Sequence, residues 1–197
     1  MTSLADDSLM TVVIDWEQDM IRRRIAVCGA PMVGKTTLLS AFCEHSATDE
    51  FYAKSSVTER LVWMTSRDAD SVRTLMAASG SVLAANNLLP WLMRNVHAIV
   101  YVIGAIEPNF GATYGLGAVQ AECERQQHFW NLYTRHALAV GSRWSQIPWV
   151  FVLNKIDLGS YNPLLEYIPT DSVSKIYLCS AVTKQGLAQL WDRILEF

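Results

Sequence analysis

Charged residues are scarce in this sequence. Asp, Glu, Lys and Arg make up 18% of its 197 residues, and the formal net charge is −3 at pH 7. Proteins that bind nucleic acid or an anionic membrane through electrostatics carry a clear excess of positive charge. The one basic cluster, Arg22 to Arg24, opens an apolar run, and we interpret it as a solvated strand end. We therefore expect no nucleic acid and no direct membrane insertion.

Cysteine is also sparse, and long apolar runs are missing. The four cysteines, at positions 28, 43, 123 and 179, form no closely spaced pair, which argues against a zinc site or a disulfide framework. The longest apolar run, around residues 98–106, falls well short of the roughly 18 residues that a membrane span needs. The polar N-terminus does not resemble a signal peptide. We expect a cytoplasmic protein with reduced cysteines.

Apolar residues, in contrast, are abundant. They make up 51% of the sequence, and seven of them are tryptophans. For a small domain this is unusual, and it predicts that a partner protein covers part of the apolar surface. The length fits one α/β domain, and we assign residues 1–9 to a flexible tail and residues 10–197 to that single domain.

A glycine loop at residues 29–36 is the strongest motif of the chain. The apolar run at residues 25–28 predicts a strand that is buried on both faces. The spacing G-x-x-x-x-G-K-T follows, and apolar residues at helical spacing come after it. A strand, a glycine loop and a helix form the context in which this motif binds nucleotide phosphates.

Each residue type in this P-loop has a chemical role. Gly29 and Gly34 permit a tight turn that points backbone N–H groups at a phosphate, and the helix N-terminus adds partial positive charge. Lys35 can bridge the β- and γ-phosphate oxygens, and the Thr36 hydroxyl can ligate Mg²⁺. Pro31 lies nearest the γ-phosphate and removes one N–H donor, which stiffens the loop. The candidate phosphate-binding residues are Gly29, Pro31, Val33, Gly34, Lys35, Thr36 and Thr37.

A second motif indicates which base is bound. Asn154, Lys155 and Asp157 follow a strand-like run, at the carboxyl edge where such sheets bind ligands. An aspartate there can accept two hydrogen bonds from guanine N1–H and the 2-amino group, a pair that adenine does not offer. The lysine stem can lie along the base, and Asn154 can brace the loop. Ser180 and Ala181 follow the last strand, where the Ala181 N–H would meet guanine O6.

Strands alternate with helices over the rest of the chain, which predicts an α/β fold with a doubly wound, mostly parallel sheet. We expect an N-terminal hairpin that uses residues 11–15 and the start of the P-loop strand. Helices are expected at 35–45, 82–96, 118–140 and 187–195, with one helical turn at 163–167. Further strands are expected at 59–66, 72–78, 97–104, 148–153 and 175–179, and loops at 46–56 and 107–117.

The P-loop, the base motif and the Ser180-Ala181 dipeptide occur in an order that resembles the Ras-like small GTPases over nearly the whole chain. That resemblance implies a P-loop NTPase fold, GTP or GDP as ligand, and Mg²⁺. More narrowly, the chain is similar to the bacterial Mgl-type gliding and polarity GTPases. Three features carry this likeness: the expected hairpin, Thr58-Glu59-Arg60 at the opening of the second strand, and a strand that runs into a glycine motif without aspartate. It implies a protein partner, such as a roadblock-type regulator or a larger complex.

The third motif of the family is degenerate here. Ras-like proteins carry an aspartate and then glycine-glutamine after the third strand, whereas this chain has Ala77, Gly80 and Ser81. Ala77 offers no carboxylate near Mg²⁺, and Ser81 is too short to position water as glutamine does. Gly80 keeps an N–H for the γ-phosphate, and the resemblance gives Arg60 the role of an internal arginine finger, with an exposed strand arginine as the alternative. We assign Lys35, Arg60, Gly80 and Ser81 to the hydrolytic site.

Two functions are compatible with this pattern. One is a GTP-dependent switch with weak hydrolysis, in which residues 46–61 and 80–95 change conformation and a partner protein responds. The other is a pseudo-GTPase that serves as a scaffold subunit of a complex. A P-loop kinase or ATPase is a third class, which the base motif argues against.

Overall fold

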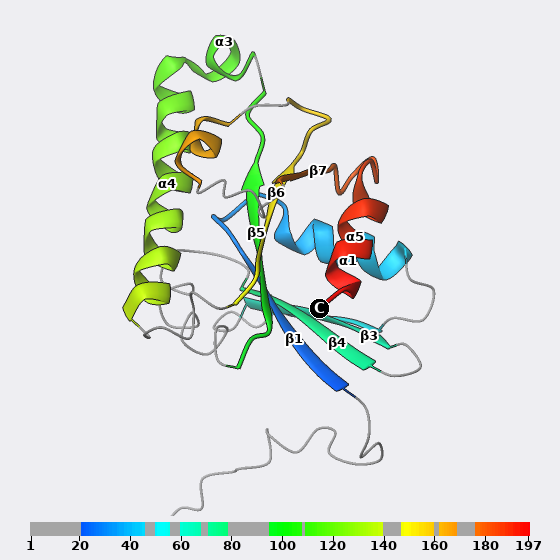
Figure 1. The fold of residues 1–197 in the computed structure, drawn as a ribbon. Helices are drawn as coiled ribbons and strands as arrows, with labels where there is room; N and C mark the ends of the chain where they lie inside the picture. Colours follow the sequence, from blue (N-terminus) through cyan, green and yellow to red (C-terminus); the bar gives the residue numbers. More distant parts are fainter. Residues whose placement is uncertain are drawn as a thin grey trace, which may run out of the picture.

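The structure is a computed structural model that describes residues 21–45, 50–55, 60–67, 71–78, 95–107, 109–139, 147–159, 162–168 and 176–197. Within these residues the chain forms an α/β fold in which helices lie on both faces of one sheet (Figure 1). The expected tail, residues 11–20 of the N-terminal hairpin and most of the helix expected at 82–96 lie outside the described residues. The division into a tail and one domain stays a prediction.

Seven strands of the described residues form the sheet, in the order β2-β3-β4-β1-β5-β6-β7. Five neighbouring strands, from β4 to β7, run parallel, and β3 is antiparallel to both of its neighbours. The mostly parallel sheet predicted from the sequence is confirmed. The strands are β1 (Ile21–Cys28), β2 (Glu50–Ser55), β3 (Arg60–Arg67), β4 (Ser71–Ala78), β5 (Ala98–Gly104), β6 (Trp149–Asn154) and β7 (Ile176–Leu178).

One edge of the sheet differs from the sequence prediction. We expected a polar loop over residues 46–56, but β2 lies within this range and pairs antiparallel with β3. Phe51 and Tyr52 favour a strand, although polar neighbours mask them in the sequence. The decisive factor is the free edge of β3, whose backbone groups offer β2 a row of hydrogen-bond partners. The hairpin expected from the two following strand-like runs is confirmed as β3 and β4.

The centre of the sheet is apolar on both faces. All seven residues of β5 are buried, and the last four residues of β1 have no exposed surface. Such continuous apolar runs are typical of parallel strands that helices cover on each side. Tyr101 of β5 packs edge-on against Trp130 and Tyr133, with ring centroids 5.0 and 5.7 Å apart. Trp130 and Tyr133 belong to the helix α4 (Leu116–Ala139), so these aromatic contacts hold α4 against the sheet.

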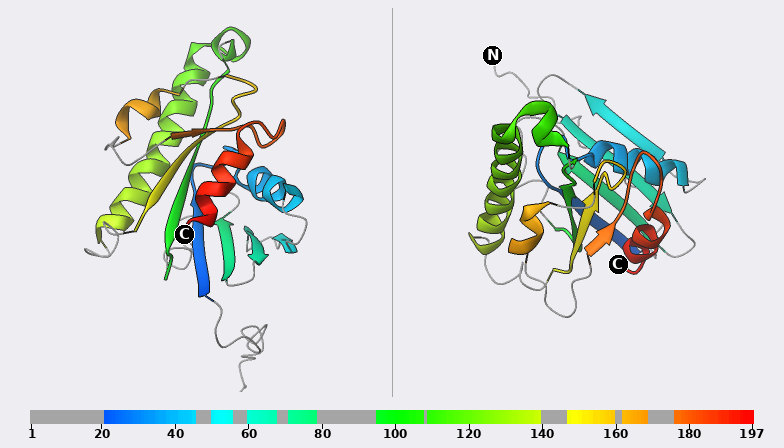
Figure 2. Two further views of the ribbon diagram at one scale, coloured as in Figure 1. Left: turned by 45° about the vertical axis from the view of Figure 1, so that its right-hand side comes forward. Right: turned by 90° about the horizontal axis from the view of Figure 1, so that it is seen from above.

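Helices flank the sheet on its two faces (Figure 2). α4 (Leu116–Ala139) follows the short helix α3 (Phe110–Tyr114) on one side, and α1 (Lys35–His45) and α5 (Leu187–Leu195) lie on the other. The loop expected at 107–117 is therefore wrong in part, because it holds α3 and the start of α4. Its glycines concealed α3 and the first two residues of α4, and Gly115, with φ of 88°, separates the two helices. None of the described helices is long and apolar enough to cross a membrane.

The helix that closes the chain has the predicted apolar stripe. Leu187, Leu190, Trp191 and Ile194 are its buried residues. The ring centroids of Trp191 and Phe42 lie 4.9 Å apart, and Phe42 is fully buried on α1. The helix after the P-loop and the last helix of the chain thus share one core. The helical turn expected at 163–167 is also confirmed, as the 3-10 helix η3 (Pro163–Tyr167).

Phe42→Ala should lower the free energy of unfolding by about 3–5 kcal/mol, because it leaves a cavity beneath Trp191. Denaturant titration followed by tryptophan fluorescence measures the change. Gln189→Ala, on the exposed side of α5, is the control and should stay within about 0.5 kcal/mol of the wild type. Equal stability of the two variants would contradict the shared core.

Candidate functional site

The loop between β1 and α1 has a backbone that only glycine permits at two positions. Gly29 has φ of 134° and Gly34 has φ of 92°. A Cβ on Gly29 would lie 2.2 Å from the carbonyl oxygen of Val102 on β5, and one on Gly34 would lie 2.4 Å from Asn154 Nδ2. The loop is therefore packed directly against the carboxyl ends of β5 and β6.

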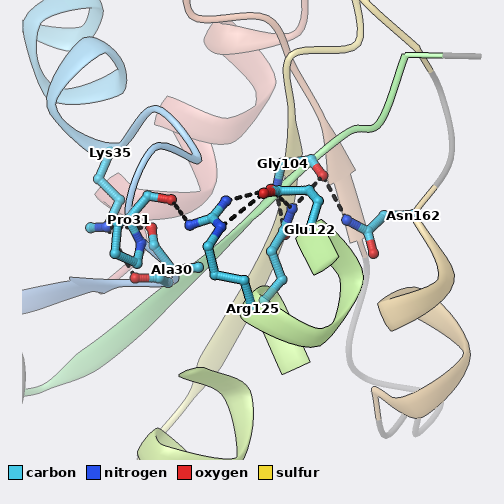
Figure 3. A network of polar contacts seen from close by, with 9 residues as sticks. Ala30, Pro31, Lys35, Gly104, Glu122, Arg125 and Asn162 are labelled. Carbon is cyan, nitrogen blue, oxygen red and sulfur yellow. Dashed lines mark hydrogen bonds and ion pairs between the residues drawn. The ribbon is translucent and has the colours of Figure 1, made fainter. Parts of the chain in front are cut away.

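Lys35 begins α1, and its ammonium group turns back into the loop (Figure 3). The residue is 6% exposed, and Nζ donates to the carbonyl oxygens of Gly29 at 3.0 Å and Ala30 at 2.7 Å. An ammonium has three N–H donors, so these bonds leave one for a phosphate oxygen. Burial lowers the pKa of Lys35 to about 8, with a smaller lowering by Arg125 and an opposing effect of Cys28. A bound anion would favour the charged form again.

Asn154, at the end of β6, joins the P-loop to the loop after β7. Its side chain is buried, and Nδ2 donates to the carbonyl oxygen of Val33 at 3.0 Å. Its Oδ1 accepts a hydrogen bond from the Ala181 backbone N–H at 3.0 Å and one from the Cys179 thiol at 3.6 Å. One amide thus fixes the spacing between the two loops.

The residues after Asn154 turn across the P-loop. Lys155 has φ of 67°, and its Cε lies 3.9 Å from the place a Cβ on Gly34 would take. The Leu158 N–H donates to the Lys155 carbonyl at 2.9 Å and closes the turn. Asp157 lies inside this turn and is exposed. The exposed side chain leaves its carboxylate accessible to a ligand.

Ser180 and Ala181 are both buried next to that turn. The Ser180 hydroxyl accepts a hydrogen bond from the Thr183 N–H at 3.0 Å, which holds the local bend. The Ala181 N–H, which we expect to meet guanine O6, donates to Asn154 Oδ1 in this structure. A base oxygen would have to share this donor with Asn154 or take it over.

The other predicted phosphate residues are divided between solvent and the interior. Thr36 and Thr37 are exposed in the first turn of α1, whereas Val33 is buried. Among the described residues, no group of three or more His, Cys, Asp and Glu side chains could hold a metal ion. The Thr36 hydroxyl suits Mg²⁺ that is bound mainly by phosphate oxygens and water. It would be the contribution of the P-loop to such a site.

The predicted hydrolytic residues are only partly within the described chain. Ala77 is fully buried and pairs with Val27 beside the P-loop, so the described end of β4 brings no carboxylate there. Arg60 is the first residue of β3, opposite Ser55 on β2. The side chain of Arg60, and Gly80 and Ser81 as a whole, lie outside the described residues.

A polar group on α4 also reaches the P-loop, and the sequence analysis missed it. Arg125 Nη1 donates to the carbonyl oxygen of Pro31, and its Nε and Nη2 donate to the carboxylate of Glu122 (Figure 3). Gln126 Nε2 donates to Glu122 Oε1 at 2.8 Å. The spacing of three and four residues signals contact along one helix face. Nothing local in the sequence signals that this face meets the P-loop.

No protein-family model matches this sequence, and comparison with curated proteins gives no match either. Among solved structures, the chain is similar to the G domain of the FeoB iron transporter of T. maritima. The TM-score is 0.48 and the sequence identity is 17%, over 89% of this chain and 98% of that one. A likeness at this level adds nothing to the assignment of the site, which depends on the residues of this chain.

Lys35→Met should change how stability depends on pH. The ordinary pKa of lysine is 10.5, and burial lowers the pKa of Lys35 to about 8, so between these values the unfolded wild type binds more protons than the folded protein. As the pH rises from about 8 to 10.5, deprotonation of Lys35 should therefore raise the free energy of unfolding of the wild type by up to about 3 kcal/mol. Denaturant titrations of both proteins measure the difference, and a difference that is independent of pH would contradict the prediction.

Proposed function

We propose that this protein binds guanine nucleotides and acts as a Ras-like molecular switch with weak GTP hydrolysis. The observation that carries the proposal is the double hydrogen bond of Asn154, to Val33 in the P-loop and to Ala181 in the loop after β7. These bonds hold the P-loop and the loop after β7 close together at the carboxyl end of the sheet. A nucleotide, with phosphates at one end and a base at the other, fits such a pair.

The phosphate end of the site is cationic and partly formed in advance. Backbone N–H groups of the loop and the N-terminus of α1 favour an anion, and Lys35 adds a full charge. The lowered pKa of Lys35 supports this role, because an anion would offset the cost of burying the ammonium. Mg²⁺, when bound, would neutralise phosphate charge, and Thr36 would be one of its ligands.

The base end of the site is suited to guanine. Asp157 is exposed, Asn154 is buried, and Cε of Lys155 lies 3.9 Å from the place a Cβ on Gly34 would take. A carboxylate can pair with both donors of guanine, whereas adenine would leave it without a matching pair.

Slow hydrolysis and a protein partner complete the proposal. Ala77 provides no carboxylate next to the P-loop, and Ser81 is too short to act as the water-positioning glutamine. A GTP-bound state would therefore persist until a partner contacts residues 46–61 and 80–95. The likeness to Mgl-type GTPases supports a roadblock-type regulator as one such partner, in the cytoplasm.

The direct test is to purify the protein, denature it and identify the released nucleotide by chromatography, together with titration of nucleotide-free protein. Release of GDP or GTP, or binding of either, supports the proposal. ATP or ADP would instead indicate a P-loop ATPase or kinase. Absence of both release and binding would favour the scaffold function.

Asp157→Asn should weaken GDP binding by at least about a hundredfold, because two hydrogen bonds to a charged acceptor are lost. It should also improve binding of xanthosine diphosphate, whose exchanged acceptor suits an amide donor. Competitive titration against labelled nucleotide measures both affinities. Asp192→Asn on the exposed side of α5 is the matched control, since it makes the same change in charge away from the loops. Retention of wild-type GDP affinity by Asp157→Asn would exclude the assigned base contact.

The wild type alone should hydrolyse GTP at or below a rate on the order of 10⁻⁴ s⁻¹, which is the intrinsic scale of Ras without its activator. Ser81→Gln should raise the rate if Arg60 can turn inward, and Arg60→Ala should then cancel the gain. Single-turnover assays on the two single variants and the double variant measure this coupling. A wild-type rate close to that of an activated enzyme would show that another residue positions the water.

A further inference from the structure

A second cation reaches the P-loop beside Lys35, and it comes from α4. Lys35 Nζ donates to the carbonyl oxygen of Ala30 at 2.7 Å, and Arg125 Nη1 donates to the carbonyl oxygen of the next residue, Pro31. Figure 3 shows the lysine side chain and the guanidinium group on either side of this stretch of loop. Two positive charges therefore converge on consecutive carbonyl groups.

We propose that Arg125 binds the γ-phosphate and makes the site favour nucleoside triphosphates over diphosphates. This inference rests on the proposed function, in which the P-loop holds a guanine nucleotide. The lysine of a P-loop reaches the β- and γ-phosphates. Because the Lys35 ammonium lies at Ala30, the outer phosphates belong near Ala30 and Pro31, where the guanidinium of Arg125 is held.

Pro31 explains why a side chain would be needed to bind a phosphate at this position of the P-loop. Proline has no backbone N–H, so the loop lacks one donor that it would otherwise offer to a phosphate. Arg125 bonds to the carbonyl of this same residue. It brings several N–H donors and a positive charge to the position where the backbone lacks a donor. The planar guanidinium fork also matches the spacing of phosphate oxygens.

The ion pair with Glu122 leaves Arg125 able to exchange partners. Both side chains of this bidentate pair are partly exposed, 29% for Arg125 and 27% for Glu122, so water screens part of their attraction. A γ-phosphate carries more negative charge than one carboxylate and should compete for the guanidinium. The lowering effect of Arg125 on the pKa of Lys35 agrees with a charge that acts inside the phosphate site.

Hydrogen bonds through Gln126 connect Glu122 to the end of β5, and this connection fixes the position of the arginine that pairs with Glu122. Gln126 is buried, donates to Glu122 Oε1, and accepts a hydrogen bond from the Gly104 N–H at 3.0 Å. The carbonyl oxygen of Gly104 also accepts from the buried Asn162 Nδ2 at 2.7 Å. This network holds the polar face of α4 at a defined place beside the P-loop. The arginine therefore needs only a side-chain movement to reach a phosphate.

The test compares affinities for GDP and for a non-hydrolysable GTP analogue in Arg125→Met and in Arg135→Met. Arg135 is an exposed arginine on the same helix and serves as the matched control. Arg125→Met should weaken the GTP analogue by about tenfold to a hundredfold, the effect of one charge-assisted hydrogen bond, and leave GDP binding unchanged. Arg135→Met should change neither. Glu122→Gln should increase the preference for the GTP analogue, because it releases the guanidinium.

The outcomes separate this inference from the function on which it rests. Equal weakening of GDP and the GTP analogue by Arg125→Met would show that the arginine only braces Pro31, and no effect on either would also overturn the inference. If the wild type prefers adenine nucleotides, the guanine assignment is wrong, and the same comparison with ADP and an ATP analogue still decides the role of Arg125. Binding of neither nucleotide class by the wild type would overturn both.

Discussion

The amide of Asn154 is the interaction on which the site depends. It is buried, and both of its polar atoms bond to backbone groups, of Val33 on one side and Ala181 on the other. Leaving a buried polar group without a partner costs about 1–3 kcal/mol, so neither loop can move away without a penalty. Because the bonds run to backbone atoms, they fix the loops whatever side chains those loops carry. The sheet sets the reach of the amide, since only β5 separates β1 from β6.

Around this bridge the site gathers positive charge that the described residues neutralise only in part. Lys35 is held in a buried place where its charged form is disfavoured, and Arg125 lies at the next carbonyl of the same loop. One carboxylate, that of Glu122, pairs with the arginine. An anion is the ligand that lowers the energy of such an arrangement. The same charges that destabilise the loop by itself would thus stabilise it around a triphosphate.

The sequence was informative where a local pattern was strong. The buried strands β5 and β6, the helix after the P-loop and the apolar stripe of α5 were predicted to within about two residues, since burial on fixed faces leaves a clear periodicity. It was least informative at β2, where the strand forms because β3 offers a free edge. It also failed at α3, because Gly111 within this helix and Gly115 at its C-terminal end resemble a loop. In both places contacts with the rest of the fold decided the conformation.

The sequence by itself predicted the chemistry of the proposed ligand, because a P-loop motif and a base motif each need only a few consecutive residues in a fixed backbone. Tertiary structure alone decided how these pieces are coupled. The bond from Asn154 to Val33 spans 121 residues of sequence, and the bond from Arg125 to Pro31 spans 94. No local spacing encodes such contacts, since they arise from the order of strands in the sheet and the packing of α4. Arg125 became a candidate only once the fold had placed α4 beside the P-loop.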